Sequence, residues 1–230
     1  MKTEINSSIV KEYGMAAGAD VVGIAASSAF ETAPDGFKPT DVLENCTSVI
    51  VLGAAFTRET LNLTPPEYTE YRNVFVAKMT DMAKAVARRI TKESGYKTKA
   101  ISATGGKWVD GKQYGHISLK HAAELAGLGV ITRNYLLTSP EYGNLLWLSA
   151  VLTVANLTPD EKSQVNFCEG CNICVEACPS GALDNIESFG KSECSKNFVI
   201  ENKKLVIKCF ECRSVCPYRF GKYETGAVKE

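Results

Sequence analysis

The chain has 230 residues, of which 45% are hydrophobic, and its 26 Lys and Arg residues balance its 26 Asp and Glu residues. This length and composition allow one large domain or two modest ones with a full core, and they exclude a largely disordered chain. The charge balance predicts no general nucleic-acid binding, which a strongly basic surface would indicate. We expect neither a membrane span nor a secretory signal, because the chain has no run of 18 apolar residues and begins with polar ones.

The hydrophobic pattern of the first 160 residues predicts strands alternating with helices. The expected helices are 4–18, 68–94 and 118–126, and the expected strands are 21–25, 48–54, 97–103 and 145–154. The stretch 48–54 is continuously apolar, which indicates a strand buried on both faces. Residues 31–42 and the glycine-rich stretch 105–115 are expected to be loops, and Pro65-Pro66 should break the chain before the long helix.

The long helix carries one apolar face, formed by Phe75, Met79, Met82, Val86 and Ile90 at helical spacing. A methionine-containing stripe of this kind could line a cofactor pocket, but it more often packs in a core. We therefore interpret these residues as core.

Eight of the nine cysteines lie between residues 168 and 216. They read Cys168-x2-Cys171-x2-Cys174-x3-Cys178-Pro179, then Cys194 alone, then Cys209-x2-Cys212-x3-Cys216-Pro217. The first run matches the bacterial ferredoxin spacing, in which three thiolates hold one [4Fe–4S] cluster and the fourth reaches across to another. This rule predicts two clusters, one on Cys168, Cys171, Cys174 and Cys216 and the other on Cys178, Cys194, Cys209 and Cys212.

Two other uses of these cysteines compete with iron–sulfur clusters. Zinc sites usually show isolated pairs of cysteines rather than three at successive three-residue steps. A disulfide framework is typical of small secreted chains, which this one does not resemble. Cys46, the ninth cysteine, is interpreted as a small buried hydrophobic residue. Reduced thiols and the lack of a signal segment together predict a cytoplasmic protein.

Strands interleaved with helices before the cysteines indicate an α/β (α+β) domain over 1–160, followed by a small ferredoxin-like domain over 161–230. No G-x-x-x-x-G-K loop is present, and no G-x-G-x-x-G follows a strand. The sequence therefore predicts no nucleotide-phosphate loop in the first domain.

One segment near the end of the predicted first domain resembles a known group of proteins. It contains Ala126-Gly127-Leu128-Gly129, Arg133-Asn134, Leu136-Leu137 and Ser139-Pro140-Glu141-Tyr142-Gly143. Together with the cysteine layout, including the lone Cys194, this segment resembles the epoxyqueuosine reductases and the reductive dehalogenases. The resemblance covers residues 8–55 and 115–218.

The resemblance implies a nitroreductase-like N-terminal domain that binds base-off cobalamin and receives electrons from two clusters in the C-terminal domain. It further implies that the segment 133–143 contacts the corrinoid through Arg133, Asn134, Ser139, Tyr142 and Gly143. The alternative is that this segment is a structural turn that locks the two domains together.

The chain departs from the family pattern at the residue that donates a proton. Epoxyqueuosine reductases carry an aspartate in a short V-D-T-G-P-like stretch, and the aligned position here is Gln113. Tyr114 and His116 are the candidate replacements, since reductive dehalogenases use a tyrosine as the acid and histidine titrates near neutrality. The alternative is that Tyr114 packs against the ring face of the cofactor or against the core, and that His116 satisfies a loop carbonyl. The repeat domain that helps some relatives bind tRNA has no counterpart here.

Two functions fit these observations. The chain is either a cobalamin-dependent reductase of a small organic substrate, or an electron-transfer or corrinoid-handling protein that serves a partner such as a corrinoid protein. In both cases a ferredoxin or flavodoxin is the expected electron donor. A third interpretation fills the first domain with flavin or another cofactor, and no sequence feature selects it.

Overall fold

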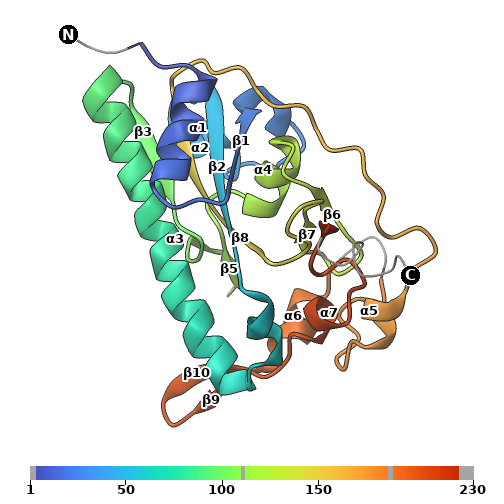
Figure 1. The fold of residues 1–230 in the computed structure, drawn as a ribbon. Coiled ribbons are helices and arrows are strands. Elements are labelled where there is room, and N and C mark those ends of the chain that lie inside the picture. Colours follow the sequence, from blue (N-terminus) through green and yellow to red (C-terminus); the bar gives the residue numbers. More distant parts are fainter. Residues whose placement is uncertain (1–3, 110–111, 186–188, 223–230) are drawn as a thin grey trace. The chain divides into compact units, whose positions relative to one another are not determined.

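The computed structural model describes residues 4–109, 112–185 and 189–222 (Figure 1). The chain forms two compact units, each built from three segments. The first unit comprises Met1–Ala55, Val76–Gly129 and Trp147–Ser163, and the second comprises Phe56–Phe75, Val130–Leu146 and Gln164–Glu230. The sequence predicted a single boundary at residue 160, which would place 56–75 and 130–146 in the first domain. In the structure these two segments belong to the second unit.

The first unit is an α/β arrangement around one four-stranded sheet. Its elements are α1 (Ser7–Ala16), β1 (Val21–Ala26), a 3-10 turn (Ser27–Phe30), α2 (Pro39–Val42), β2 (Ser48–Ala55), most of α3 (Pro65–Ser94), β3 (Thr98–Ile101), β4 (Lys107–Val109), β5 (Lys112–Tyr114), α4 (Leu119–Leu125) and β8 (Leu146–Thr153). The strand order is β1-β2-β8-β3, with β1 antiparallel to β2 and β3 antiparallel to β8. Every residue of β2 except the last is buried, which confirms the prediction from its apolar sequence.

Helices cover both faces of this sheet. A Cβ added to Gly14 of α1 would lie 2.5 Å from the Val22 side chain, so α1 packs closely on the face to which Val22 points. A Cβ added to Gly23 would lie 2.4 Å from the Ala126 carbonyl oxygen, immediately after α4. Because neighbouring strand residues point to opposite faces, α1 and α4 lie on opposite sides of β1.

The apolar stripe of α3 is core, as predicted. Met79, Met82, Val86 and Ile90 are buried, and Phe75 is half-buried. The helix is the longest element in Figure 1. No helix among the described residues combines the length and the apolar character that crossing a bilayer demands.

The second unit consists of short elements. They are a 3-10 turn (Arg58–Asn62), the start of α3, β6 (Val130–Ile131), β7 (Leu137–Thr138), α5 (Ile173–Glu176), α6 (Lys191–Ser195), β9 (Phe198–Glu201), β10 (Lys204–Ile207) and α7 (Glu211–Ser214). The pairs β6–β7 and β9–β10 are two-stranded antiparallel hairpins.

Three sequence expectations about the elements of the two units were wrong. The stretch 31–42 is not only a loop, because it contains α2. Pro65 and Pro66 begin α3 rather than break the chain before it, because proline is tolerated in the first turn of a helix. Thr64 caps this turn, since its backbone N–H and its hydroxyl both donate to Glu67 Oε2, at 2.9 and 2.6 Å. The stretch 105–115 is not only a loop, because it contains the β4–β5 hairpin.

Candidate metal centre

Four thiols of the second unit surround one cavity. They are Cys168, Cys171, Cys174 and Cys216, here called the first thiol group. The pKa of Cys174 rises to about 11, first because it is buried and then because the three other thiols of the group lie close. This is the set that the ferredoxin spacing assigns to one cluster, including Cys216 from the far end of the cysteine-rich stretch.

The other four thiols form a second thiol group of Cys178, Cys194, Cys209 and Cys212. Burial raises the pKa of Cys212 to about 12, with the nearby Arg213 guanidinium opposing this and the Cys194 and Cys209 thiols adding to it. Burial also raises the pKa of Cys194, and Cys209 and Cys178 raise it further. The first group's Cys174 also acts on Cys212, so the two groups lie next to each other.

Cys178 differs from the other members of its group. Its burial would raise the pKa, but hydrogen bonds from Ser180 and from the Ala182 and Leu183 backbone outweigh it, and the pKa is lowered. Backbone N–H groups that donate to sulfur stabilise the thiolate, which is the form that binds iron.

The arrangement of thiols suits a cluster better than a disulfide. All nine cysteines are free thiols in the structure. No three His, Cys, Asp or Glu side chains in the described part of the chain converge as a single metal ion requires. A cubane cluster is a larger group, and it is held by four separate thiolates around it. Four thiols around one cavity match that requirement.

The segment 132–144 makes hydrogen bonds to a residue of each thiol group. The Arg133 backbone N–H donates to Cys168 Sγ at 3.4 Å, and Asn134 Nδ2 donates to the Cys212 carbonyl oxygen at 2.9 Å. Asn134 Oδ1 in turn accepts hydrogen bonds from Thr132 Oγ1 and from the Leu136 backbone N–H, at 2.9 and 3.1 Å. The Asn134 side chain is thus buried and fully used within the protein.

The second half of this segment is held in the same way. Ser139 and Gly143 bond to each other through their backbones, at 2.7 and 2.9 Å. Gly143 has φ +55°, and an added Cβ would lie 2.2 Å from the Arg219 carbonyl oxygen. Asn144 Nδ2 donates to the Arg213 carbonyl oxygen at 3.1 Å. We call the segment 132–144 the clamp, because it binds the thiol-bearing chain at several points.

The predicted corrinoid contacts therefore divide into two sets. Asn134, Ser139 and Gly143 use polar groups in hydrogen bonds within the second unit. Tyr142 is half-buried. Arg133 borders an open cavity of about 490 Å³ that also exposes Cys168 and Cys171, and among the described residues its buried Nε has no hydrogen-bond partner. Of the five, Arg133 is the residue whose surroundings best fit contact with a bound group.

The sequence analysis did not identify Asn144, which is fully buried and whose side chain bonds the clamp to Arg213 of α7. The signal that could have revealed it is a lone amide between Gly143 and the apolar run of β8. A buried amide in such a place needs partners.

The candidate proton donors belong to the first unit. Tyr114 is the last residue of β5, is 39% exposed, and packs edge-on against Phe37 with ring centroids 6.0 Å apart. His116 is half-buried in the loop after it. Gln113 lies in β5 at the position that the family pattern gives to an aspartate.

Comparison with known proteins finds a matching family model and relatives that are similar in sequence. A family model described as a 4Fe-4S binding domain matches residues 165–184. The epoxyqueuosine reductase of Bacillus subtilis is 24% identical over 92% of this chain, and the match spans 63% of that enzyme. In a shorter match, the Listeria monocytogenes enzyme is 34% identical over 46% of this chain and 31% of its own length.

Solved structures show the same fold. The epoxyqueuosine reductase of Streptococcus thermophilus matches with a TM-score of 0.68 and 21% identity, over 94% of this chain and 66% of its own. A B12-dependent reductive dehalogenase matches with a TM-score of 0.71 and 20% identity, over 96% of this chain and 33% of its own. The predicted α/β fold with a ferredoxin-like C-terminal region is confirmed. In sequence the chain is similar to the epoxyqueuosine reductases, although it spans less than two thirds of the length of the curated relatives named above, and it shares its fold with both the epoxyqueuosine reductases and the reductive dehalogenases.

Proposed function

We propose that the chain is a reductase that passes electrons through two [4Fe–4S] clusters to a base-off corrinoid, which reduces an organic substrate. The observation that carries this proposal is the pair of thiol groups, each with four sulfurs, and the Asn134 side chain relates them, since it lines the cavity of the first group and donates to the carbonyl oxygen of Cys212 in the second. The first thiol group would hold one cluster and the second thiol group the other. Adjacent clusters give electrons a short route through the second unit.

The corrinoid part of the proposal rests on the clamp and on the relatives. When bound, cobalamin would supply a cobalt centre that accepts electrons at low potential. Arg133 is the residue that we assign to it, since its Nε has no hydrogen-bond partner in the described part of the chain and the cavity beside Cys168 leaves room for a further group. Asn134 and Gly143 would act indirectly, by holding the clamp rigid.

The substrate to test first is epoxyqueuosine in tRNA. One solved structural neighbour is an epoxyqueuosine reductase in complex with an epoxyqueuosine-modified tRNA stem loop, with a TM-score of 0.64 over 92% of this chain. Binding of one modified stem loop needs local recognition rather than a basic surface overall, so the charge balance of the chain does not oppose it.

A second candidate function is an electron-transfer or corrinoid-handling protein without a substrate of its own. Gln113 favours it, because an amide cannot donate a proton as a carboxylic acid does. In a structural neighbour, the Bacillus subtilis reductase, a catalytic loop carries an aspartate that is seen swung out of the active site. In this chain, Tyr114 or His116 would have to replace that acid.

Anaerobic reconstitution tests the proposal. The purified chain is incubated with iron, sulfide and hydroxocobalamin, desalted, and examined by optical and EPR spectroscopy. We expect about eight irons per chain, from two four-iron clusters, and a retained base-off cobalt signal. Eight irons without cobalt would support the electron-transfer function instead. Turnover of an epoxyqueuosine-modified stem loop, and a faster rate in Gln113→Asp, would then assign the substrate.

Three variants test which thiols share a cluster. Cys171→Ser and Cys216→Ser should each remove about four irons and the same EPR signal, because both thiols belong to the first thiol group. Cys46→Ala is the matched control, since Cys46 is buried in the first unit and belongs to neither group. Loss of different signals in the two serine variants would contradict the crossed assignment.

A further inference from the structure

The β9–β10 hairpin projects from the chain between two thiols of the second thiol group. Cys194 precedes β9 and Cys209 follows β10. The hairpin is fixed at its base, where the Asn197 N–H donates to the Cys194 carbonyl oxygen at 3.1 Å and the Lys208 N–H donates to the Asn197 carbonyl oxygen at 2.8 Å. A molecule bound to the hairpin would therefore lie close, along the chain, to both thiols.

One face of this hairpin is apolar and open to solvent. The register pairs Leu205 with Ile200 and Ile207 with Phe198, so these four side chains share a face. Ile200 is 69% exposed, Leu205 48% and Phe198 43%. Three large apolar side chains exposed together on one small element are typical of an interaction site.

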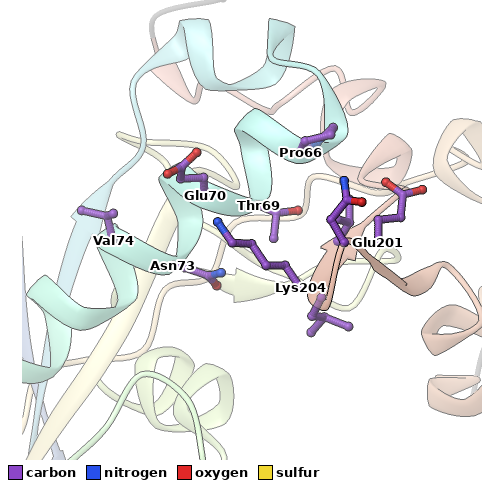
Figure 2. A pocket seen from close by; sticks show the side chains of 10 residues that line it. Pro66, Thr69, Glu70, Asn73, Val74, Glu201 and Lys204 are labelled. Carbon is purple, nitrogen blue, oxygen red and sulfur yellow. The ribbon is translucent and has the colours of Figure 1, made fainter.

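The hairpin is supported from the side of α3. The Ile207 N–H donates to Thr69 Oγ1 at 2.9 Å, and Val206 is buried. A groove of about 620 Å³ runs between the hairpin and the start of α3, and Figure 2 shows Lys204 reaching from the hairpin toward Glu70 and Asn73. The exposed apolar side chains therefore belong to a hairpin that is held against α3 by a hydrogen bond and a buried side chain.

The hairpin segment carries an excess of positive charge, and its two adjacent lysines lie at the tip, beside the apolar face. Residues 191–211 contain five lysines and three glutamates. Lys196 and Lys208 pair with Glu193 and Glu201. Lys203 stands with Lys204 at the tip, where Asn202 and Lys203 have φ of +49° and +64°, as a two-residue turn requires. Lysines on an edge strand also discourage strand pairing, but that role does not explain the exposed apolar residues.

We propose that this hairpin is the docking surface for a small acidic electron-carrier protein that reduces the second cluster. The inference rests on the proposed function, because it requires a cluster on the second thiol group. The apolar face would form the centre of the contact and the lysines its rim, with acidic residues of the donor opposite them. One electron passes per encounter: the donor is oxidised by one electron, the cluster is reduced by one, and no bond is made or broken.

Stopped-flow reduction of the reconstituted chain tests the proposal, with a reduced acidic ferredoxin as the probe. Ile200→Asp/Leu205→Asp should slow reduction by ferredoxin at least about tenfold, because it places acid on the face that meets an acidic partner. Lys203→Glu/Lys204→Glu should slow it and flatten its dependence on ionic strength. Dithionite needs no docking, so it should reduce all variants at the wild-type rate.

Two control variants carry the same kinds of change in the first unit. Met15→Asp alters an exposed apolar residue of α1, and Lys84→Glu/Lys92→Glu reverses two exposed lysines of α3. Both should keep the wild-type rate with ferredoxin.

Unchanged ferredoxin kinetics in the hairpin variants would overturn the proposal. So would a dimer of the wild-type chain that the apolar variant dissociates while the monomer keeps the wild-type rate, because the face would then join two copies. Failure of the proposed function is distinguishable, since the wild-type chain would then lack iron or would not be reduced by dithionite.

Discussion

Arg133 offers two groups to the surroundings of Cys168. Its backbone N–H donates to the Cys168 sulfur, and its side chain borders the cavities beside the first thiol group. Hydrogen bonds and positive charge near a cluster stabilise the reduced form, which carries one more negative charge. Mutation can separate the contributions of the side chain and the backbone, because substitution of Arg133 removes the guanidinium and leaves the backbone N–H.

We expect Arg133→Gln to lower the reduction potential of the cluster on the first thiol group by tens of millivolts. For one electron, about 59 mV corresponds to a tenfold change in the equilibrium. Arg133→Lys keeps the charge and is the matched control, with a potential nearer to that of the wild type. EPR-monitored redox titration of the reconstituted proteins gives the measurement. Equal potentials in all three proteins would show that the guanidinium does not act on the cluster.

At the scale of single elements, the clamp depends on close backbone contact. Gly143 combines a positive φ with the approach of the Arg219 carbonyl oxygen, so Gly143→Ala meets both strain and collision. We expect it to destabilise the second unit by about 1–3 kcal/mol or more. Urea titration followed by far-ultraviolet circular dichroism, which reports on both units, measures this and the variant below.

Gly105→Ala separates backbone strain from collision with the Arg219 carbonyl oxygen. Gly105 also has a positive φ, at +87°, but an added Cβ would meet nothing within 4 Å. It therefore carries the backbone strain alone. If both alanine variants lose equal stability, the collision with Arg219 is unimportant and the clamp is looser than the structure indicates.

The first unit offers a pH-dependent test in the contact between α1 and α3. Tyr13 Oη donates to Glu93 Oε2 at 2.5 Å, and the Arg89 guanidinium lies 3.9 Å from the centre of the Tyr13 ring. The hydrogen bond to Glu93, together with burial, raises the pKa of Tyr13 above its usual value of 10.0. A raised pKa means that the folded state favours the protonated phenol. Its contribution to stability is therefore complete below pH 10 and is lost as the pH rises through the raised pKa.

Tyr13→Phe should accordingly destabilise the first unit at pH 8, and the difference from the wild type should shrink above pH 10. Urea unfolding followed by far-ultraviolet circular dichroism at both pH values gives the comparison. A difference that stays constant up to pH 11 would mean that ring packing, and not the hydroxyl, links the two helices.

Local sequence signals predicted the buried strands and the long helix of the first unit but not its β4–β5 hairpin, and they were insufficient for the clamp. The apolar run of β2 and the stripe of α3 predict burial, because both patterns report contacts with a nearby core. The start of α3 was missed, although the sequence shows the Thr64-x-x-Glu67 pattern of a helix N-terminus and the Glu67 carboxylate accepts from the Thr64 backbone N–H. Asn134 and Asn144 could not be assigned in this way, since their partners, Cys212 and Arg213, lie 78 and 69 residues further along the chain.

At the scale of the whole molecule, the two units differ in what stabilises them. The first unit has a sheet covered by helices on both faces. In the second, α5, α6 and α7 have only four or five residues each. Helices of this length and isolated two-stranded hairpins are not stable alone in water. If clusters bind the thiol groups, their binding free energy must contribute to the folding of the second unit.

We therefore expect removal of iron from the full chain to loosen the second unit alone. Hydrogen–deuterium exchange, compared before and after treatment with a chelator and an oxidant, should show lost protection in 130–145 and 164–222. The strands β2 and β8 should keep theirs, because their burial does not involve the thiols. Loss of protection throughout the chain would mean that the two units fold as one.

Hydrogen–deuterium exchange along α3 gives the most specific version of this test. The helix is continuous from Pro65 to Ser94, but its residues up to Phe75 belong to the second unit and those from Val76 to the first. Met79, Val86 and Ile90 are buried in a core that needs no metal, whereas Thr69 bonds to the β10 backbone. Iron removal should therefore increase exchange in the first turns of α3 and leave the rest unchanged. Uniform exchange along the helix would show that helical cooperativity overrides the boundary between the units.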